Sequence, residues 1–203
     1  NRDGFDIDCC KYLTISNCKI NTPHDDALVL KSSYALKKPV LTEHIAITNC
    51  VITGYKFGTF LDGTYIPEKV NWVCGRFKLG TESNGGYRNI SLSNCTFMYS
   101  SGLAFEEVDQ GLMENIVVNN ITMNHVHHYP IYITTGCRNR GPKERTTVST
   151  GRDIMISNMV ANDVDSLAGI IVTGMPDEPL RNITLSNIQL QFRGGGRAEL
   201  AKR

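Results

Sequence analysis

One pattern of hydrophobic and polar positions recurs six times along this chain. Two apolar residues alternate with other residues, an asparagine follows, and a further apolar residue comes shortly after it, as in Ile90-Ser91-Leu92-Ser93-Asn94. Strict alternation predicts a β-strand with one buried face. Asparagine tolerates the left-handed backbone conformation, so it can turn the chain where the strand ends. The asparagines that end the six copies are Asn17, Asn49, Asn94, Asn120, Asn158 and Asn187.

A second apolar strand usually follows each copy, as at Gly102-Leu103-Ala104-Phe105. The copies recur every few tens of residues, and a unit of that length must stack on its neighbours to bury its apolar face. We therefore expect an all-β chain that forms a right-handed parallel β-helix, a solenoid, as a single domain over residues 1–203. The six asparagines should be buried between coils and joined by amide hydrogen bonds. Neither end carries an obvious cap, so we expect part of a longer protein that lacks its terminal coils.

The charge balance and the cysteines argue against nucleic-acid, membrane and metal binding. With 21 basic and 20 acidic residues the formal net charge is +1, which gives no field for binding nucleic acid or an anionic membrane. No apolar run approaches the roughly 20 residues of a membrane span.

The odd number of cysteines argues against a complete disulfide framework. No Cys or His cluster has zinc spacing, so we expect no metal. Cys18, Cys50 and Cys95 each follow directly after the asparagine of a repeat copy, and we expect small buried residues at this position.

Aspartates gather near the start of the chain. We expect Asp3, Asp6 and Asp8 on the first strand, and Asp25 and Asp26 at the start of the strand one coil later. Stacked strands lie about 4.8 Å apart, so residues one coil apart become neighbours. Acid/base hydrolysis of a glycosidic bond requires such a group, because one carboxylic acid protonates the leaving oxygen and a carboxylate activates water. Crowding raises the pKa of carboxyl groups and keeps one of them protonated.

These residues also resemble the motifs of a known family. The run Asn1-Arg2-Asp3-Gly4-Phe5-Asp6, followed by Asp25-Asp26 and Lys31-Ser32, is similar to the Asn-Thr-Asp-Gly, Gly-Asp-Asp and Lys-Ser segments of glycoside hydrolase family 28, the polygalacturonase family. The stretch from Leu79 to Ile90 resembles the family's Ile-Gly-Ser segment with its subsequent Gly-Gly and Asn-Val. The resemblance implies inverting hydrolysis of a pectic or related uronate-containing polysaccharide without a cofactor. Asp25 would be the general acid, and Asp3 and Asp26 would hold and activate water.

Two departures from the family pattern imply altered specificity. The family's Gly-His-Gly falls on Cys74-Gly75-Arg76, so its histidine is absent. Its Arg-Ile-Lys, the basic pair that grips galacturonate, falls on Ala104-Phe105-Glu106. The chain thus resembles a divergent bacterial-type member, similar to those acting on rhamnogalacturonan, and this implies a secreted or periplasmic protein. The oligomeric state stays open.

Several charged residues are candidate ligands of the polysaccharide, because cations suit uronate carboxylates and a carboxylate accepts sugar hydroxyl groups. They are Lys31, Arg76, Lys78, Glu106, Arg138 and Arg140. Trp72, in the longest insertion, is expected to have a packing role. Two alternatives remain open: a polysaccharide lyase on the same fold, which usually needs Ca²⁺ and a basic residue, and a non-catalytic glycan-binding β-helix.

Overall fold

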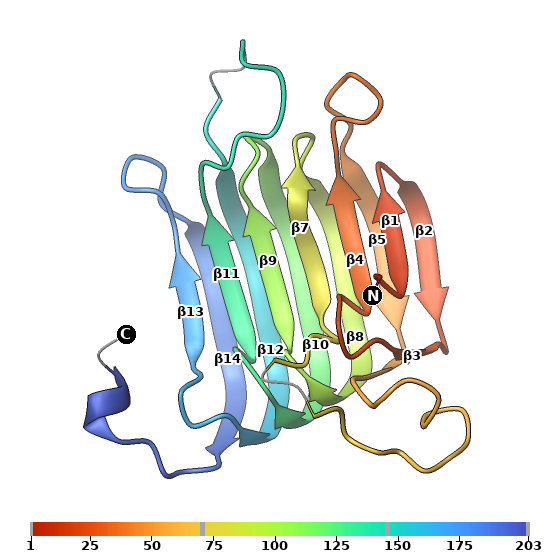
Figure 1. Ribbon diagram of the computed structural model, residues 1–203. Helices are drawn as coiled ribbons and strands as arrows, with labels where there is room; N and C mark the ends of the chain where they lie inside the picture. Colours follow the sequence, from red (N-terminus) through yellow and green to blue (C-terminus); the bar gives the residue numbers. More distant parts are fainter. Residues whose placement is uncertain (1, 70–71, 145–146, 202–203) are drawn as a thin grey trace.

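The computed structural model describes residues 2–69, 72–144 and 147–201, and its strands form two sheets that face each other (Figure 1). The six-stranded sheet contains β1 (Phe5–Asp8), β4 (Leu28–Ser32), β7 (Phe77–Ser83), β9 (Leu103–Glu107), β11 (Ile131–Thr135) and β13 (Ile170–Thr173), in that spatial order. The eight-stranded sheet contains β2 (Lys11–Ser16), β3 (Lys19–Asn21), β5 (Thr42–Thr48), β6 (Val51–Thr53), β8 (Tyr87–Ser100), β10 (Leu112–Val126), β12 (Thr150–Val164) and β14 (Arg181–Phe192). The single short helix of the described residues is η1 (Ala198–Ala201).

The chain passes alternately through the two sheets, and all pairings between these strands are parallel. Each strand therefore stacks on the corresponding strand one chain turn earlier. Phe5 pairs with Leu28, Leu28 with Phe77, and Phe77 with Leu103. The all-β class and the parallel pairing expected from the repeat are confirmed.

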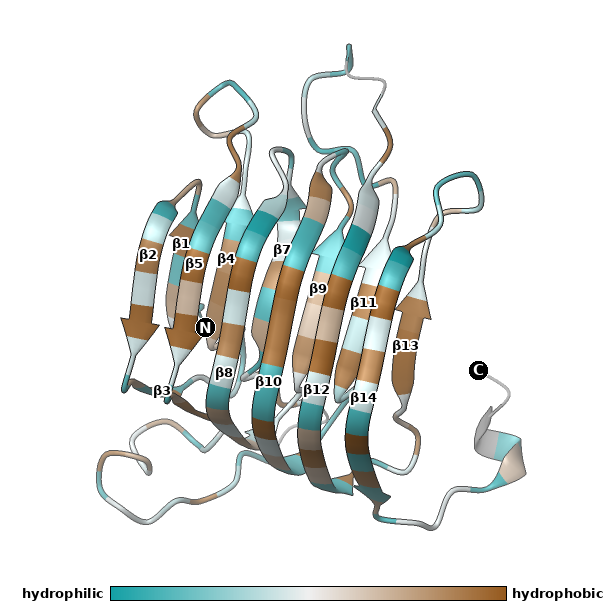
Figure 2. Cartoon of the chain, turned by 180° about the vertical axis from the view of Figure 1, so that it is seen from behind, coloured by the Kyte–Doolittle hydropathy of each residue, from teal (hydrophilic) through white to brown (hydrophobic). Residues whose placement is uncertain are grey.

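The apolar positions of both sheets meet in the space between them. On β8 the side chains of Ile90, Leu92, Cys95 and Phe97 are almost completely buried. Figure 2 shows the corresponding positions of neighbouring strands aligned in apolar bands across the eight-stranded sheet. The expected burial is confirmed for Cys50 and Cys95, and the cysteines of the described part are all free thiols.

The long strands bend at residues with left-handed backbone, which recur every five positions. On β8 these residues are Asn89, Asn94 and Tyr99, with φ between 54° and 55°. A left-handed residue interrupts the strict alternation, so two consecutive side chains face outward before the next apolar one turns inward. This explains why the repeat spaces its buried residues alternately by two and three.

The repeat asparagines occupy these left-handed positions, with φ between 50° and 58°. Asn120 Nδ2 donates to Asn94 Oδ1 over 3.1 Å, and Asn187 Nδ2 donates to Asn158 Oδ1 over 2.6 Å. The predicted bonding between chain turns is therefore confirmed for these two pairs. The predicted burial is wrong, because all six side chains lie on the outer surface of the sheet.

A second ladder of left-handed residues runs five positions earlier and uses mixed residue types. Asn115 Nδ2 donates to Asn89 Oδ1 over 3.1 Å. Further along the same ladder Asn182 Nδ2 donates to Asp153 Oδ1 over 2.8 Å. The rings of Tyr12 and His44, both also at positive φ, stack with centroids 4.8 Å apart.

The insertions leave the sheets at the two ends of the strands. The segments after β4, β11 and β13 project from the upper edge in Figure 1, and the segment between β6 and β7 projects from the lower edge. Residues that precede the strands of the six-stranded sheet thus gather at one edge, and residues that follow them gather at the other. Within the described ranges, no helix has the length and hydropathy of a membrane span.

Candidate active site

Four aspartates near the start of the chain, Asp3, Asp6, Asp25 and Asp26, line one open cavity of about 500 Å³, the acidic pocket, whereas Asp8 bonds Ser33 at the other end of β1. Asp3 lies two residues before β1, and Asp26, which follows Asp25, lies two residues before β4. Backbone hydrogen bonds fix these adjacent segments: Gly4 N donates to the carbonyl of Asp26 over 2.9 Å, and Gly75 N donates to that of Asp25 over 2.9 Å. Carboxylate oxygens of Asp25 and Asp26 lie within 4.8 Å of each other.

Asp25 is the carboxyl group of this pocket best suited to hold a proton. Burial raises its pKa above the ordinary value, a hydrogen bond with the Asp3 side chain raises it further, and so do the negative charges of Asp3 and Asp26. The hydrogen bond that Asp26 N donates to Asp25 Oδ1 over 3.0 Å opposes this rise without cancelling it.

Asp26, in contrast, is surrounded by donors and cations. Arg76 Nε donates to its Oδ1 over 2.5 Å, and Lys78 Nζ lies 3.5 Å from its Oδ2. Cys74 Sγ lies 3.2 Å from Oδ1, and burial together with the Asp26 charge raises the pKa of this thiol to about 12. Cys74 is therefore a thiol donor at neutral pH, and the negative charge of Asp26 is stabilised from three directions.

Lys31 has a similar relation to Asp3. Its Nζ donates to Asp3 Oδ2 over 2.9 Å and to Asp6 Oδ2 over 2.7 Å. Partial burial disfavours the charged amine, but the hydrogen bonds with Asp6 and Asp3 outweigh this effect and raise the pKa of Lys31. Lys31 thus lines the pocket, with its charge already engaged by two carboxylates.

Glu106 completes a charge network with the remaining predicted cations. Its Oε1 lies 3.8 Å from Arg76 Nη2 and 3.7 Å from Lys78 Nζ. Arg76 and Lys78 each lie between Asp26 and Glu106, so two cations face two carboxylates. Neither cation is free to accept a substrate carboxylate without giving up a contact that it already makes.

A second cavity of about 490 Å³ adjoins this network, and we call it the aromatic hollow. Four rings line it: those of Trp72, His128, Tyr129 and Tyr132. Arg76 links the two cavities, since it lines the hollow and bonds Asp26 in the acidic pocket. The sequence pattern pointed to none of these rings as a binding surface, because Trp72 lies far in the sequence from His128, Tyr129 and Tyr132.

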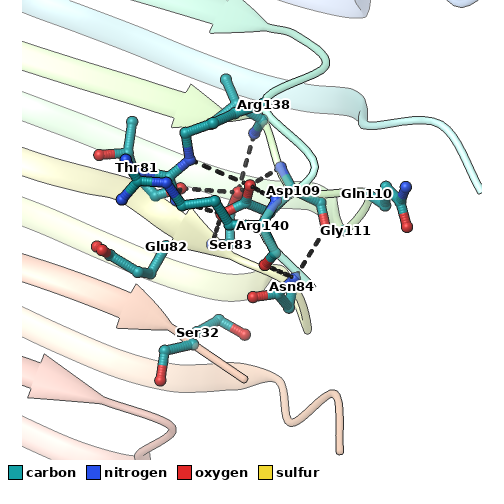
Figure 3. Close-up of polar contacts among 12 residues, drawn as sticks. Ser32, Thr81, Glu82, Ser83, Asn84, Asp109, Gln110, Gly111, Arg138 and Arg140 are labelled. Carbon is teal, nitrogen blue, oxygen red and sulfur yellow. Dashed lines mark hydrogen bonds and ion pairs between the residues drawn. The ribbon is translucent and has the colours of Figure 1, made fainter. Parts of the chain in front are cut away.

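Arg138 and Arg140 lie elsewhere, beyond the carboxyl end of β11 (Figure 3). Arg138 forms a two-point ion pair with the fully buried Asp109 and donates from Nη2 to the carbonyl of Thr81 over 2.6 Å. Arg140 N donates to Asp109 Oδ1 over 2.8 Å, and Asn84 Nδ2 donates to the Arg140 carbonyl over 2.6 Å. Neither arginine lines the acidic pocket, although Arg138 bonds the carbonyl of Thr81, which does. Both arginines anchor the loop that follows β11.

Within the part of the chain that the structure describes, one group has ligand atoms close enough together for a metal ion: Asp25, Asp26 and Cys74. Two of its members are poor ligands in this environment. Asp26 is already paired with Arg76, and a thiol whose pKa is raised to about 12 does not readily give up its proton to a metal. The geometry is better suited to proton transfer than to metal binding.

Comparison with known proteins adds no family: no family model matches the chain, and no curated protein matches its sequence. Membership of glycoside hydrolase family 28 therefore stays a prediction, and the arguments for a function come from the site itself.

Proposed function

We propose that the protein is a glycoside hydrolase that cleaves a pectic or related uronate-containing polysaccharide by acid/base catalysis in the acidic pocket. One observation carries the proposal: a carboxyl group with a raised pKa, Asp25, lies in an open cavity beside a carboxylate held by cations, Asp26. Glycoside hydrolysis needs one carboxyl group that can donate a proton and a second that can accept one from water.

In the proposed reaction Asp25 donates its proton to the glycosidic oxygen as the bond to the anomeric carbon breaks. Asp26, oriented by Arg76, accepts a proton from water, whose oxygen attacks the anomeric carbon. Asp3, oriented by Lys31, helps to hold that water. Burial of these groups strengthens each interaction, because the local dielectric constant is lower than that of water.

The stereochemical course is a separate proposal that rests on the family resemblance. Inverting pairs usually stand roughly 6.5–9.5 Å apart, and retaining pairs roughly 5 Å apart. Oxygens of Asp25 and Asp26 lie within 4.8 Å, which is nearer to the retaining spacing. We keep inversion as the proposal, with the attacking water held between Asp3 and Asp26, and the anomeric form of the first product decides it.

The proposed framework for this site is a right-handed parallel β-helix. Its support is the alternation of the chain between two parallel sheets. Crossovers between parallel strands are right-handed in about 98% of cases.

The contacts do not favour a lyase. The catalytic base of a lyase must be free to take a proton, and Lys31, Arg76 and Lys78 are all ion-paired.

The test is digestion of rhamnogalacturonan and polygalacturonate by the full chain, compared with its Asp25→Asn variant. We expect new reducing ends without an ultraviolet-absorbing unsaturated product. The variant should lose about 10²–10⁴-fold in rate and keep its far-ultraviolet circular dichroism spectrum. Asp177→Asn, at an exposed aspartate in the segment after β13, is the matched control and should retain full activity. Equal rates for Asp25→Asn and the parent would refute the assignment, and an unsaturated product would indicate a lyase.

A further inference from the structure

We propose that the aromatic hollow binds a neutral pyranose residue, a hexose or 6-deoxyhexose, next to the bond cleaved at the aspartates. This inference rests on the proposed function, because it places the hollow and the acidic pocket along one polysaccharide. It extends that function by naming the chemical class of the sugar on one side of the cleaved bond.

The four rings form a continuous row along the hollow. The centroids of Trp72 and His128 are 4.9 Å apart, those of His128 and Tyr129 are 4.2 Å apart, and those of Tyr129 and Tyr132 are 5.7 Å apart. Trp72 is 52% exposed although its Nε1 donates to Ser101 Oγ over 3.0 Å. A concave site with aromatic walls and a few polar groups is typical of binding sites for small, partly apolar molecules. The C–H face of a pyranose fits such a wall.

The polar groups of the hollow suit hydroxyl groups. Glu106 meets its cations only at 3.7 and 3.8 Å, so its carboxylate oxygens keep the capacity to accept hydrogen bonds from a sugar. Burial and the nearby Arg76 charge lower the pKa of His128, so at neutral pH its ring has one donor and one acceptor nitrogen. A carboxylate and a neutral imidazole recognise hydroxyl groups well.

The charges of the hollow disfavour a uronate. Arg76 is the one cationic side chain among its lining residues once His128 is neutral. Its guanidinium is already shared between Asp26 and Glu106. A uronate carboxylate here would meet the negative charge of Glu106 without an unengaged cation, and like charges at close range are unfavourable.

The position of the hollow connects it to the site of cleavage. Lys78, Ala104 and Tyr132 pair side by side on β7, β9 and β11 and form one row across the six-stranded sheet. Lys78 lines the acidic pocket and Tyr132 lines the hollow, two strand spacings or roughly 10 Å away. Ala104 between them carries only a methyl group and lines the hollow floor. A polysaccharide that runs across the strands can therefore occupy both cavities.

Trp72 provides a direct reporter, because it is the sole tryptophan of the chain. The experiment titrates the full-length Asp25→Asn protein, in which cleavage is slowed, with rhamnogalacturonan oligosaccharides, galactan oligosaccharides and oligogalacturonate. We expect a saturable change in Trp72 fluorescence with at least one of the first two probes and at least tenfold weaker binding of oligogalacturonate. Equal or tighter binding of oligogalacturonate, or no response to either probe that contains neutral sugars, would overturn the inference.

Variants locate the binding. Removing a ring with Tyr132→Ala should weaken binding about 3–10-fold, and Ala104→Leu should weaken it by filling the floor. Tyr12→Ala, at an exposed tyrosine of the eight-stranded sheet, is the control and should bind like the parent. Parent-like affinity of both hollow variants would place the sugar elsewhere and overturn the inference.

A parallel product assay with the Asp25-containing protein separates the two proposals. If it cleaves polygalacturonate while the Trp72 titrations show no neutral sugar bound, the hydrolase proposal stands and the neutral subsite falls. If the titrations show the expected binding and no polysaccharide is cleaved, the hollow still binds a neutral sugar but the hydrolase proposal falls.

Discussion

Arg76 donates from Nε to Oδ1 of Asp26 over 2.5 Å, and its Nη2 lies 3.8 Å from Glu106. The same guanidinium lies 5.9 Å from the centroid of the Trp72 ring, within the range of a cation–π contact. One side chain therefore contacts the candidate catalytic base, the neighbouring carboxylate and the wall of the aromatic hollow. Because Arg76 is engaged in this way, it positions Asp26. The sequence had suggested Arg76 as a ligand of a substrate carboxylate.

The first prediction concerns the pH dependence of hydrolysis. Asp3→Asn removes a negative charge that raises the pKa of Asp25, so that pKa should fall. A general acid must be protonated to act, and activity is lost as the pH rises through its pKa. The alkaline limb of the pH–rate profile should therefore move to lower pH in Asp3→Asn. Initial rates of reducing-end release across the pH range measure this limb.

The control for this prediction is Asp177→Asn, whose alkaline limb should coincide with that of the parent. A limb that stays in place in Asp3→Asn would mean that Asp25 does not supply the proton.

The second prediction is that alanine substitutions of Arg138 and Arg140 differ in their effect on stability. Arg138→Ala leaves Asp109 fully buried without its cation, which should cost about 3–5 kcal/mol of the free energy of unfolding. Arg140 contacts Asp109 and Asn84 through backbone atoms, which alanine retains. Arg140→Ala should therefore change stability by less than about 0.5 kcal/mol. Urea unfolding followed by circular dichroism measures both values.

The same variants test whether these arginines bind substrate. Arg140→Ala should keep the KM of the parent, because its loop lies at the edge of the sheet opposite the segments that carry the aspartates. A large rise in KM at unchanged stability would contradict this placement and restore Arg140 as a substrate ligand.

The repeat allowed the strands and their parallel stacking to be predicted, because buried positions such as Ile90 and Leu92 alternate on one face. It did not reveal the ladder through Tyr12, His44 and Asp153. Their left-handed backbone has the same role as that of Asn94, but their residue types differ from turn to turn. The burial of the asparagines was predicted wrongly, because the left-handed position points its side chain outward.

The site was predictable where neighbours lie one chain turn apart, as with Asp3 and Asp25. The ion pairs were not predictable, because the sequence does not determine which cation contacts which carboxylate, as for Arg76 and Asp26. The aromatic hollow was also missed. Trp72 comes from an insertion whose path the sequence does not determine, and Tyr132 differs little in sequence context from any outward-facing strand residue.

The third prediction tests the outer ladder. At φ 55° any β-carbon is strained, and asparagine offsets part of this cost of roughly 1–2 kcal/mol through its short polar side chain. Asn120→Ala keeps the β-carbon and loses that compensation together with the hydrogen bond to Asn94, so it should be less stable than the parent by about 1 kcal/mol. Asn120→Gly loses the same amide but relieves the strain, so it should be the more stable of the two. Asn124→Ala, on the exposed face of the same strand, should change stability by less than about 0.5 kcal/mol. Equal stability of the alanine and glycine variants at position 120 would show that the left-handed backbone is not what the asparagine provides.

The last prediction concerns the buried carboxyl group of Glu107, which is fully inaccessible to solvent. Burial raises its pKa from 4.5 to about 8, although Gly111 N donates to its Oε1 over 2.9 Å, and the charge of Asp109 adds to the rise. Between these two pH values the folded protein holds a proton that the unfolded chain has released. The free energy of unfolding should therefore fall as the pH rises from about 4.5 to about 8, and then level off.

Glu107→Gln should remove this dependence, because glutamine does not titrate and keeps an oxygen that can accept the hydrogen bond from Gly111. The parent should lose on the order of a few kcal/mol between pH 5 and pH 8 relative to the variant. Urea unfolding at a series of pH values measures the difference, which cancels contributions from the other titrating groups. Glu144→Gln, at an exposed glutamate, is the control and should follow the parent at every pH. If the parent and Glu107→Gln show the same pH dependence, Glu107 is ionised in the folded protein at neutral pH, and a donor or cation must reach its Oε2, which has no hydrogen-bond partner within the described residues.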